Sequence, residues 1–270
     1  MNPFWCDYPR DFVAVRGADA LTYLHSQISQ DIRGLGVGAS AYSFVLQPTG
    51  KIEALLRVNR IGDEEFILDV EPGYGEGVIA RLNRFKIRVK VDIVESDWRC
   101  IAVRGVEVMP ASAVAAWGLT DGYDLIGPDP TSPPNIAAGT VEQLHAARIG
   151  AGWPAMGVEI TETSIPAETG VVDLAVNFTK GCYPGQELVE RMDSRGSAAP
   201  RFVRLLRGTV TVEVGAELQR DGKIVGRITS ISIESAGWTA LALVARAVQP
   251  GDTVVVNEAE ILVESAPARA

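Results

Sequence analysis

The residues best suited to chemistry lie together in one segment, from Asn177 to Met192. Within it, Cys182 stands among two glycines and a proline, a combination that predicts a tight loop. The residues from Gln186 onward are typical of a helix, and Glu187 and Arg191 have the spacing of four that stabilises one by about 0.2–0.5 kcal/mol. We therefore expect Cys182 just ahead of a helix N-terminus.

Two neighbours of Cys182 favour the ionised, reactive form of its thiol. The positive end of the following helix dipole stabilises a negative sulfur, and Lys180 adds a cation two residues back. The alternative is a small cysteine buried beside a turn, which needs no chemistry. Exposure of Cys182 decides between the two, and the sequence leaves both open.

The composition is that of an ordinary globular protein of 270 residues, with 47% hydrophobic and 22% charged side chains. Its net charge of −9 argues against a general nucleic-acid binder, because such binding depends on neutralising phosphates. The three cysteines lack the close pairs of metal sites and disulfide frameworks, so we expect no metal and a reducing compartment, the cytoplasm. No apolar stretch reaches the roughly 20 residues of a membrane span. The first residues have no apolar core of the kind that marks a secretory signal.

Apolar periodicity predicts an α+β arrangement of helices and strands. Strands over 41–46 and 52–60 flank a turn cluster at 47–51. After residue 200 the chain changes to short strands, with Asp221-Gly222 as a strong hairpin signal, and this series predicts a small barrel or sandwich. Helices are expected from Asp19 to about residue 28 and over residues 74–85, 111–117 and 140–150.

The segment around Cys182 also matches a known family. Residues 180–187 read Lys-Gly-Cys-Tyr-Pro-Gly-Gln-Glu, which resembles the K-G-C-Y-x-G-Q-E box of the YgfZ family, the folate-binding relatives of the glycine-cleavage T protein. The resemblance covers nearly the whole chain, with a loose middle around residues 95–140. Its other matching stretches are Gly17–Ala20 with Leu24 and Gln27, Arg148–Ile149, Gly152–Pro154, Ile165–Glu168 and Gly226–Ser230.

This resemblance implies a fold of the α+β class, a three-subdomain ring of the T-protein folate-binding type. Two subdomains are expected to be ferredoxin-like and the last a β-barrel. We expect an N-terminal α+β folate-binding subdomain over residues 1–95 and a second over residues 96–200, which carries the loop 127–134 and the box. The C-terminal barrel would span residues 201–270, and the first two subdomains could interleave along the chain.

One departure from the T proteins bears on activity. T proteins carry a Gly-Gly-x-x-Asp-Asp strand whose aspartate assists methylene transfer to tetrahydrofolate, and Ala54 and Leu55 stand here in place of the paired aspartates. These side chains can neither take a proton nor stabilise a cation. Glu53 lies one residue away and, on a strand, would point to the opposite face. The departure disfavours aminomethyltransferase activity.

The resemblance also suggests which residues hold tetrahydrofolate or a derivative of it. Glu168 corresponds to a glutamate that binds the pterin ring in T proteins, and a carboxylate can accept two parallel N–H bonds from an aminopyrimidine edge. Arg201 and Arg204 could meet the negative glutamate tail. Glu168 could instead cap a helix start, and the arginines could be ordinary surface charges. The expected folate-binding residues are Glu168, Lys180, Tyr183, Gln186 and Arg201, with Cys182 as the reactive residue.

The resulting hypothesis is a folate-binding accessory protein that helps to assemble or repair 4Fe–4S clusters in client enzymes, including enzymes that modify tRNA. It follows from the resemblance, since no residue shows an iron–sulfur client directly. Folate and iron–sulfur client proteins are the expected partners, without membrane or direct nucleic-acid contact, and a monomer is expected. Two alternatives stay open: a tetrahydrofolate-dependent aminomethyltransferase-like enzyme, and a non-catalytic scaffold that has lost folate.

Overall fold

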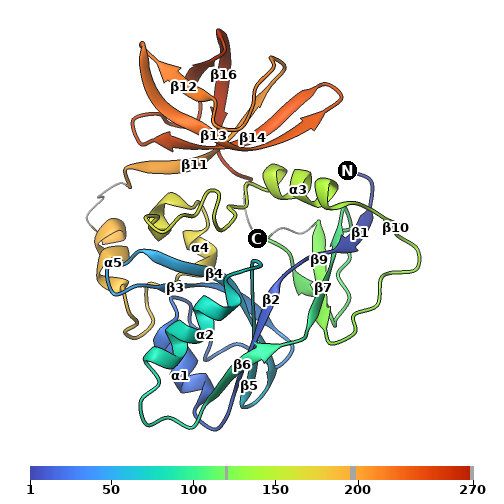
Figure 1. The fold of residues 1–270 in the computed structure, drawn as a ribbon, viewed down its shortest axis with the longest axis vertical. Helices are drawn as coiled ribbons and strands as arrows, with labels where there is room; N and C mark the ends of the chain where they lie inside the picture. The colour runs from blue at the N-terminus through green and yellow to red at the C-terminus, as the bar shows by residue number, and fades with distance from the viewer. Residues whose placement is uncertain (119–120, 195–198, 268–270) are drawn as a thin grey trace.

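The computed structural model describes residues 1–118, 121–194 and 199–267. Figure 1 shows two five-stranded sheets in the lower part of the molecule and a closed six-stranded barrel at the top. Helices are few and lie against the sheets. This arrangement confirms the α+β class and the C-terminal β-barrel.

The first sheet has the strand order β3-β4-β5-β2-β6, and its neighbouring strands are antiparallel. Strand residues alternate between the two faces, so one face, with Val13 and Leu68, packs against Leu24 and Leu82 of two helices. The elements are β2 (Asp11–Arg16), α1 (Ala20–Gln27), β3 (Ser40–Leu46), β4 (Ile52–Gly62), β5 (Glu65–Val70), α2 (Gly75–Arg84) and β6 (Asp92–Ser96). The helices expected near residues 19–28 and 74–85 are thereby confirmed.

The second sheet has the order β10-β1-β7-β9-β8 and contains the first strand of the chain. Its elements are β1 (Phe4–Asp7), β7 (Arg99–Arg104), β8 (Val114–Ala115), β9 (Gly122–Gly127), β10 (Ala137–Ala138) and α3 (Val141–Gly150). Helix α3 lies against β1 and β7. It begins with a capping box, in which the Thr140 hydroxyl accepts from the Gln143 amide and the Gln143 side chain accepts from the Thr140 amide.

The barrel closes through the strand order β11-β14-β13-β12-β15-β16. The predicted hairpin turn Asp221-Gly222 joins β12 to β13, and both residues have positive φ (51° and 72°), which suits a type I′ turn. The strands are β11 (Arg201–Gly208), β12 (Glu217–Arg220), β13 (Lys223–Glu234), β14 (Gly237–Ala245), β15 (Thr253–Val256) and β16 (Ala259–Glu264). Leu206, Trp238 and Val254 are among the residues that fill the interior.

The segment between α3 and the barrel returns to the first sheet. It contains the 3₁₀ turn η1 (Pro166–Glu168), α4 (Val172–Ala175) and α5 (Gln186–Ser194). Helix α4 lies beside β3, and the Ser29 hydroxyl donates to the Ala175 carbonyl at 2.6 Å. The chain therefore crosses between the two sheets three times, from β1 to β2, from β6 to β7 and again after α3. The residue ranges assigned above to the three subdomains stay a prediction.

A buried ion network joins the two sheets. Arg57 of β4 donates from Nε to Oδ2 of Asp69 on β5 (2.9 Å) and from Nη1 to Oδ2 of Asp124 on β9 (2.8 Å). Arg10 and Arg104 donate to the same two carboxylates. Burial alone would raise the pKa of Asp69, but Arg57 and Arg10 lower it below its ordinary value.

A second network joins the lower part of the molecule to the barrel. Glu159 has a fully buried side chain and accepts from Arg148 of α3 (Nη1, 3.0 Å) and from the Ala155 amide (2.9 Å). Its other oxygen accepts from the hydroxyls of Thr229 and Ser230 on β13, each at 2.6 Å. Both charges are thus compensated inside the protein, which is the condition for burying them.

The helix expected over residues 111–117 is wrong. The chain forms a turn, in which the Ala113 amide donates to the Pro110 carbonyl, and then the two-residue strand β8. Trp117 has a positive φ of 53°, which a helix does not allow, and its amide donates to the Tyr42 hydroxyl at 2.9 Å. Pairing with β9 and the contact with β3 thus override the helical preference of the alanines.

Candidate functional site

The predicted box forms a loop that rests on the turn between β3 and β4. Gly185 has a φ of +84°, and a Cβ added there would lie 2.5 Å from the Gln47 carbonyl oxygen. A Cβ added at Gly50, in the turn itself, would likewise lie 2.5 Å from the Cβ of Leu188. Glycine is therefore required on both sides of the contact, because any side chain would separate the two segments.

Lys180 ties the same loop to the end of α1. Its ammonium donates to the carbonyls of His25 and Ile28, each at 2.5 Å, where the last carbonyls of a helix favour a cation. The ammonium also lies 5.0 Å from the centre of the Tyr183 ring. Burial lowers the pKa of Lys180 to about 8. Lys180 thus fixes the position of the box relative to the end of α1.

Tyr183 and Gln186 hold the loop from inside. The Tyr183 amide donates to Oε1 of Gln186 at 2.9 Å, at the start of α5. The Tyr183 ring is buried, and burial raises its pKa to about 12, so the phenol stays protonated near neutral pH. The ion pair expected between Glu187 and Arg191 is present at 2.9 Å on the exposed side of α5.

Cys182 is exposed, in contrast to Cys6 and Cys100, which are buried. Burial raises the pKa of both buried thiols. The alternative of a buried Cys182 is thereby removed. The loop places Cys182 at the surface while the side chains of Lys180 and Tyr183 turn inward.

Glu168 and Arg201, expected at opposite ends of a bound folate, contact each other. Nε of Arg201 donates to Oε1 of Glu168 at 3.1 Å, and the Ile165 amide lies 3.4 Å from Oε2. The Glu168 side chain is only 5% exposed, whereas that of Arg201 is 35% exposed. Arg204 lies over the ring of Phe202, 4.8 Å from its centre, and burial lowers its pKa. The Glu168–Arg201 ion pair joins η1 to β11, the first strand of the barrel.

Strand β4 brings no carboxylate to the core between the two sheets. Leu55 faces that core together with Tyr183, and Ala54 faces the helices on the other side of the sheet. Glu53 pairs with Arg81 of α2 at 3.1 Å, on the side of the helices. The one carboxylate of β4 is therefore directed away from the core between the two sheets.

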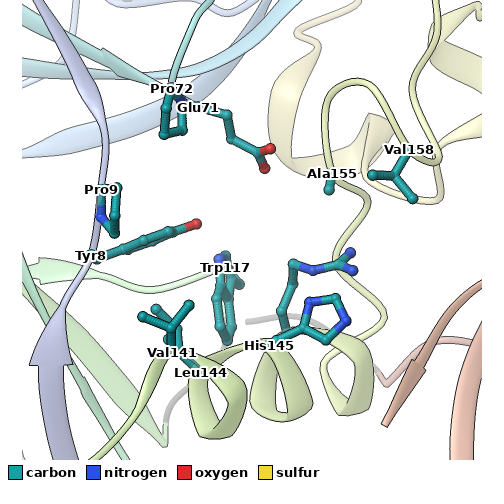
Figure 2. A pocket seen from close by; sticks show the side chains of 11 residues that line it. Tyr8, Pro9, Glu71, Pro72, Trp117, Val141, Leu144, His145, Ala155 and Val158 are labelled. Atoms are coloured by element: carbon teal, nitrogen blue, oxygen red, sulfur yellow. The ribbon is translucent and has the colours of Figure 1, made fainter.

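A cavity of about 260 Å³ lies between the two sheets, α3 and the segment after it. Figure 2 shows the Glu71 carboxylate and the Tyr8 hydroxyl directed into it, with Trp117 and His145 below them in this view. Oε2 of Glu71 accepts from the Met156 amide at 3.1 Å, and burial raises the pKa of this carboxyl. No sequence signal points to this site, because Glu71-Pro72 after a strand is typical of a surface turn.

Within the described ranges, no three His, Cys, Asp or Glu side chains come together as a metal site. Across the same part of the chain, no helix is long and apolar enough to cross a membrane.

The fold defines the class of protein. It is similar to the crystal structure of glycine cleavage system aminomethyltransferase T from Bartonella henselae, with a TM-score of 0.78 over 99% of this chain and 86% of that chain. At 18% sequence identity this likeness establishes the fold alone. The chain therefore has the fold of the glycine-cleavage T proteins.

Sequence comparisons narrow the class to a family. Residues 11–116 match the GCVT N-terminal domain. An uncharacterized protein of Haemophilus influenzae is 27% identical over 84% of this chain and 83% of its own length. The tRNA-modifying protein YgfZ of Escherichia coli O157:H7 is 26% identical over 76% of this chain and 72% of its own. The chain is therefore similar to proteins of the YgfZ/GCVT-like family, and its residues 11–116 match that family's N-terminal domain.

A eukaryotic relative extends the comparison. The iron-sulfur cluster assembly factor IBA57 homolog, mitochondrial, of Mycosarcoma maydis is 24% identical over 73% of this chain. The match spans 55% of that relative's length.

Proposed function

We propose that this chain is a folate-binding accessory protein that assists the assembly or repair of 4Fe–4S clusters in client enzymes, including tRNA-modifying enzymes. Its relatives named as an iron–sulfur cluster assembly factor and a tRNA-modifying protein support this role. The net charge of −9 favours proteins over nucleic acid as direct partners. We propose a monomer that works in the cytoplasm.

The exposed position of Cys182 carries the proposal. Its neighbours in the box, Lys180, Tyr183 and Gln186, are engaged in contacts that hold the loop, so their side chains position Cys182. A surface thiol on a firmly held loop can reach a partner, and a thiolate is a preferred ligand of iron–sulfur clusters. Cys182 would act as the transient ligand of a cluster or client during transfer or repair.

The chain also offers groups that suit a folate. The cavity beside Glu71 has apolar and aromatic walls with a carboxylate directed into it, and Glu168 and Arg201 provide a carboxylate and a guanidinium at the barrel. These residues would hold the ring system and the acidic tail. Bound tetrahydrofolate would supply a reduced carrier of one-carbon groups.

Calorimetric titration with tetrahydrofolate tests the binding part of the proposal. Micromolar binding is expected for the intact protein, and no turnover is expected when an aminomethyl donor is added, since no carboxylate of β4 faces the core. Absence of binding heat would leave a scaffold that has lost folate. Turnover of the donor would instead establish the aminomethyltransferase alternative.

A further inference from the structure

The segment between α2 and β6 concentrates positive charge in a chain whose net charge is −9. Residues 84–90, the basic loop, contain four cations within seven positions: Arg84, Lys86, Arg88 and Lys90. Most of the described arginines form an ion pair with a carboxylate, whereas none of these four side chains does so within the described ranges. Their charge is therefore not neutralised by direct contact with a carboxylate of the chain.

The fold holds the basic loop at both ends. The Lys86 ammonium donates to the Val91 carbonyl at 3.1 Å, and the Lys90 amide donates to Oδ2 of Asp19 at 2.7 Å. Gly17 permits this close approach, because a Cβ there would lie 2.3 Å from the Lys90 carbonyl oxygen. A loop that is already ordered loses little conformational entropy when a partner binds.

Two features of the basic loop favour a binding surface over a solvated helix end. The dipole of α2 accounts for a cation at Arg84, in the last turn of the helix, but Arg88 lies beyond the helix. Arg88 has a φ of +55°, a conformation that glycine adopts with less strain. Between the cations, the side chain of Ile87 is 74% exposed. An apolar centre within a polar rim is typical of protein–protein interfaces.

The surroundings of the basic loop distinguish an acidic protein from other polyanions. Proteins that recognise RNA bases stack them on aromatic rings, but the ring of the loop, Phe85, is half-buried and lies 4.0 Å from the Arg81 guanidinium. An anionic membrane would require a broad apolar face beside the cations, and Ile87 is a single side chain. Asp19 and the exposed Asp92 also lower the charge that a phosphate backbone would meet.

The basic loop lies close to the box. The Lys90 amide is bound by Asp19, immediately before α1. Lys180 donates to the carbonyls of His25 and Ile28 at the other end of this helix. The eight residues of α1 span about 12 Å at about 1.5 Å per residue. A protein–protein interface of ordinary size, about 800 Å² per partner, is wide enough to cover both positions.

We propose that the basic loop is the docking site for an acidic surface of the client protein, which it brings to Cys182. This inference rests on the proposed function and adds the chemistry of the partner, carboxylates that surround a contact with Ile87. Attraction between the loop and a negative client would speed their encounter and fix its orientation. The negative charge of the rest of the chain would oppose contact through other faces.

Binding of three probes to the full chain at physiological salt tests the class of partner: a poly-L-glutamate peptide, a tRNA, and vesicles that contain phosphatidylserine. Arg84→Glu/Arg88→Glu reverses two charges of the basic loop. Lys223→Glu/Arg246→Glu is the matched control, because it reverses two exposed cations of the barrel end of the molecule. If a thermal melt shows that the loop variant is not folded, Arg84→Gln/Arg88→Gln takes its place. Maturation of a 4Fe–4S client enzyme is measured for the same variants and for Cys182→Ala.

We expect poly-L-glutamate to bind the loop variant about tenfold more weakly than the unmodified protein and the control. Client maturation should fall in the loop variant and stay unchanged in the control. The inference is overturned if poly-L-glutamate does not bind the unmodified protein, or if tRNA or the vesicles bind through the loop more strongly than poly-L-glutamate. Equal maturation in the loop variant and the control would also overturn it. If maturation is then lost in Cys182→Ala, the proposed function stands without this docking site, and if it is not, both fail.

Discussion

The box around Cys182 and the cavity beside Glu71 are two candidate sites built in different ways. The box is a short continuous segment, and contacts from Lys180 to the end of α1 and from Gln186 to the Tyr183 amide hold it in place. The cavity draws on five separate segments, next to a network that crosses from α3 to the barrel. Loss of one of these side-chain contacts of the box should therefore cost less stability than loss of a contact in the buried network beside the cavity.

The largest effect on stability is expected from Glu159→Gln. The substitution keeps the shape but leaves the buried guanidinium of Arg148 without its counter-charge, and breaking such a pair costs about 3–5 kcal/mol. Urea unfolding measures the loss. Glu187→Gln breaks the exposed pair with Arg191 and is the matched control, with an expected change of at most about 0.5 kcal/mol. Equal losses in both variants would refute the contrast between the two regions.

Lowering the pH should destabilise the protein through Asp69, in the buried ion network that joins the two sheets. The pKa of Asp69 is lower in the folded protein than in the unfolded chain, where it is about 3.9. Its contribution to stability is therefore complete well above pH 4 and is lost as the pH falls below about 4 toward the folded value. Each unit of lowering corresponds to about 1.4 kcal/mol. Unfolding at a series of pH values should show this loss, and Asp69→Asn should flatten it.

A smaller effect is expected from Lys180→Met, which keeps an unbranched side chain but removes the bonds to His25 and Ile28. Hydrogen bonds from a charged donor contribute about 1.5–3 kcal/mol, and part of that is offset because burial opposes the ammonium. We expect a loss of about 1–2 kcal/mol in unfolding free energy. Hydrogen exchange should quicken in the box and at the end of α1. Faster exchange in the barrel instead would show that Lys180 does not act locally.

The same contrast explains what the sequence could predict. The box, the hairpin at Asp221-Gly222 and the helix expected over residues 140–150 depend on residues within a few positions of each other, and short-range rules identify them. The helix expected over 111–117 fails because Trp117 is held by Tyr42, 75 residues away. Glu71 and Tyr8 line one cavity but follow strands of different sheets, 63 positions apart in the chain. Long-range pairing of this kind leaves no local pattern.

Contacts between candidate residues also cannot be predicted from the sequence. The family resemblance assigns Glu168 and Arg201 each to folate, whereas the structure brings them into contact with each other at 3.1 Å. Lys180, Tyr183 and Gln186 belong to the box as expected, but their side chains are engaged within the protein. Residue identity predicts which groups gather in one region, whereas the direction of each side chain depends on the packing.

The most direct test of the account compares function and stability in Cys182→Ala. Maturation of a 4Fe–4S client enzyme would be measured under oxidative stress, next to urea unfolding of the purified variant. Because Cys182 is exposed, the free energy of unfolding should change by no more than about 0.5 kcal/mol, while maturation should be lost. Maturation that remains intact in a stably folded Cys182→Ala protein would contradict the role assigned to this cysteine.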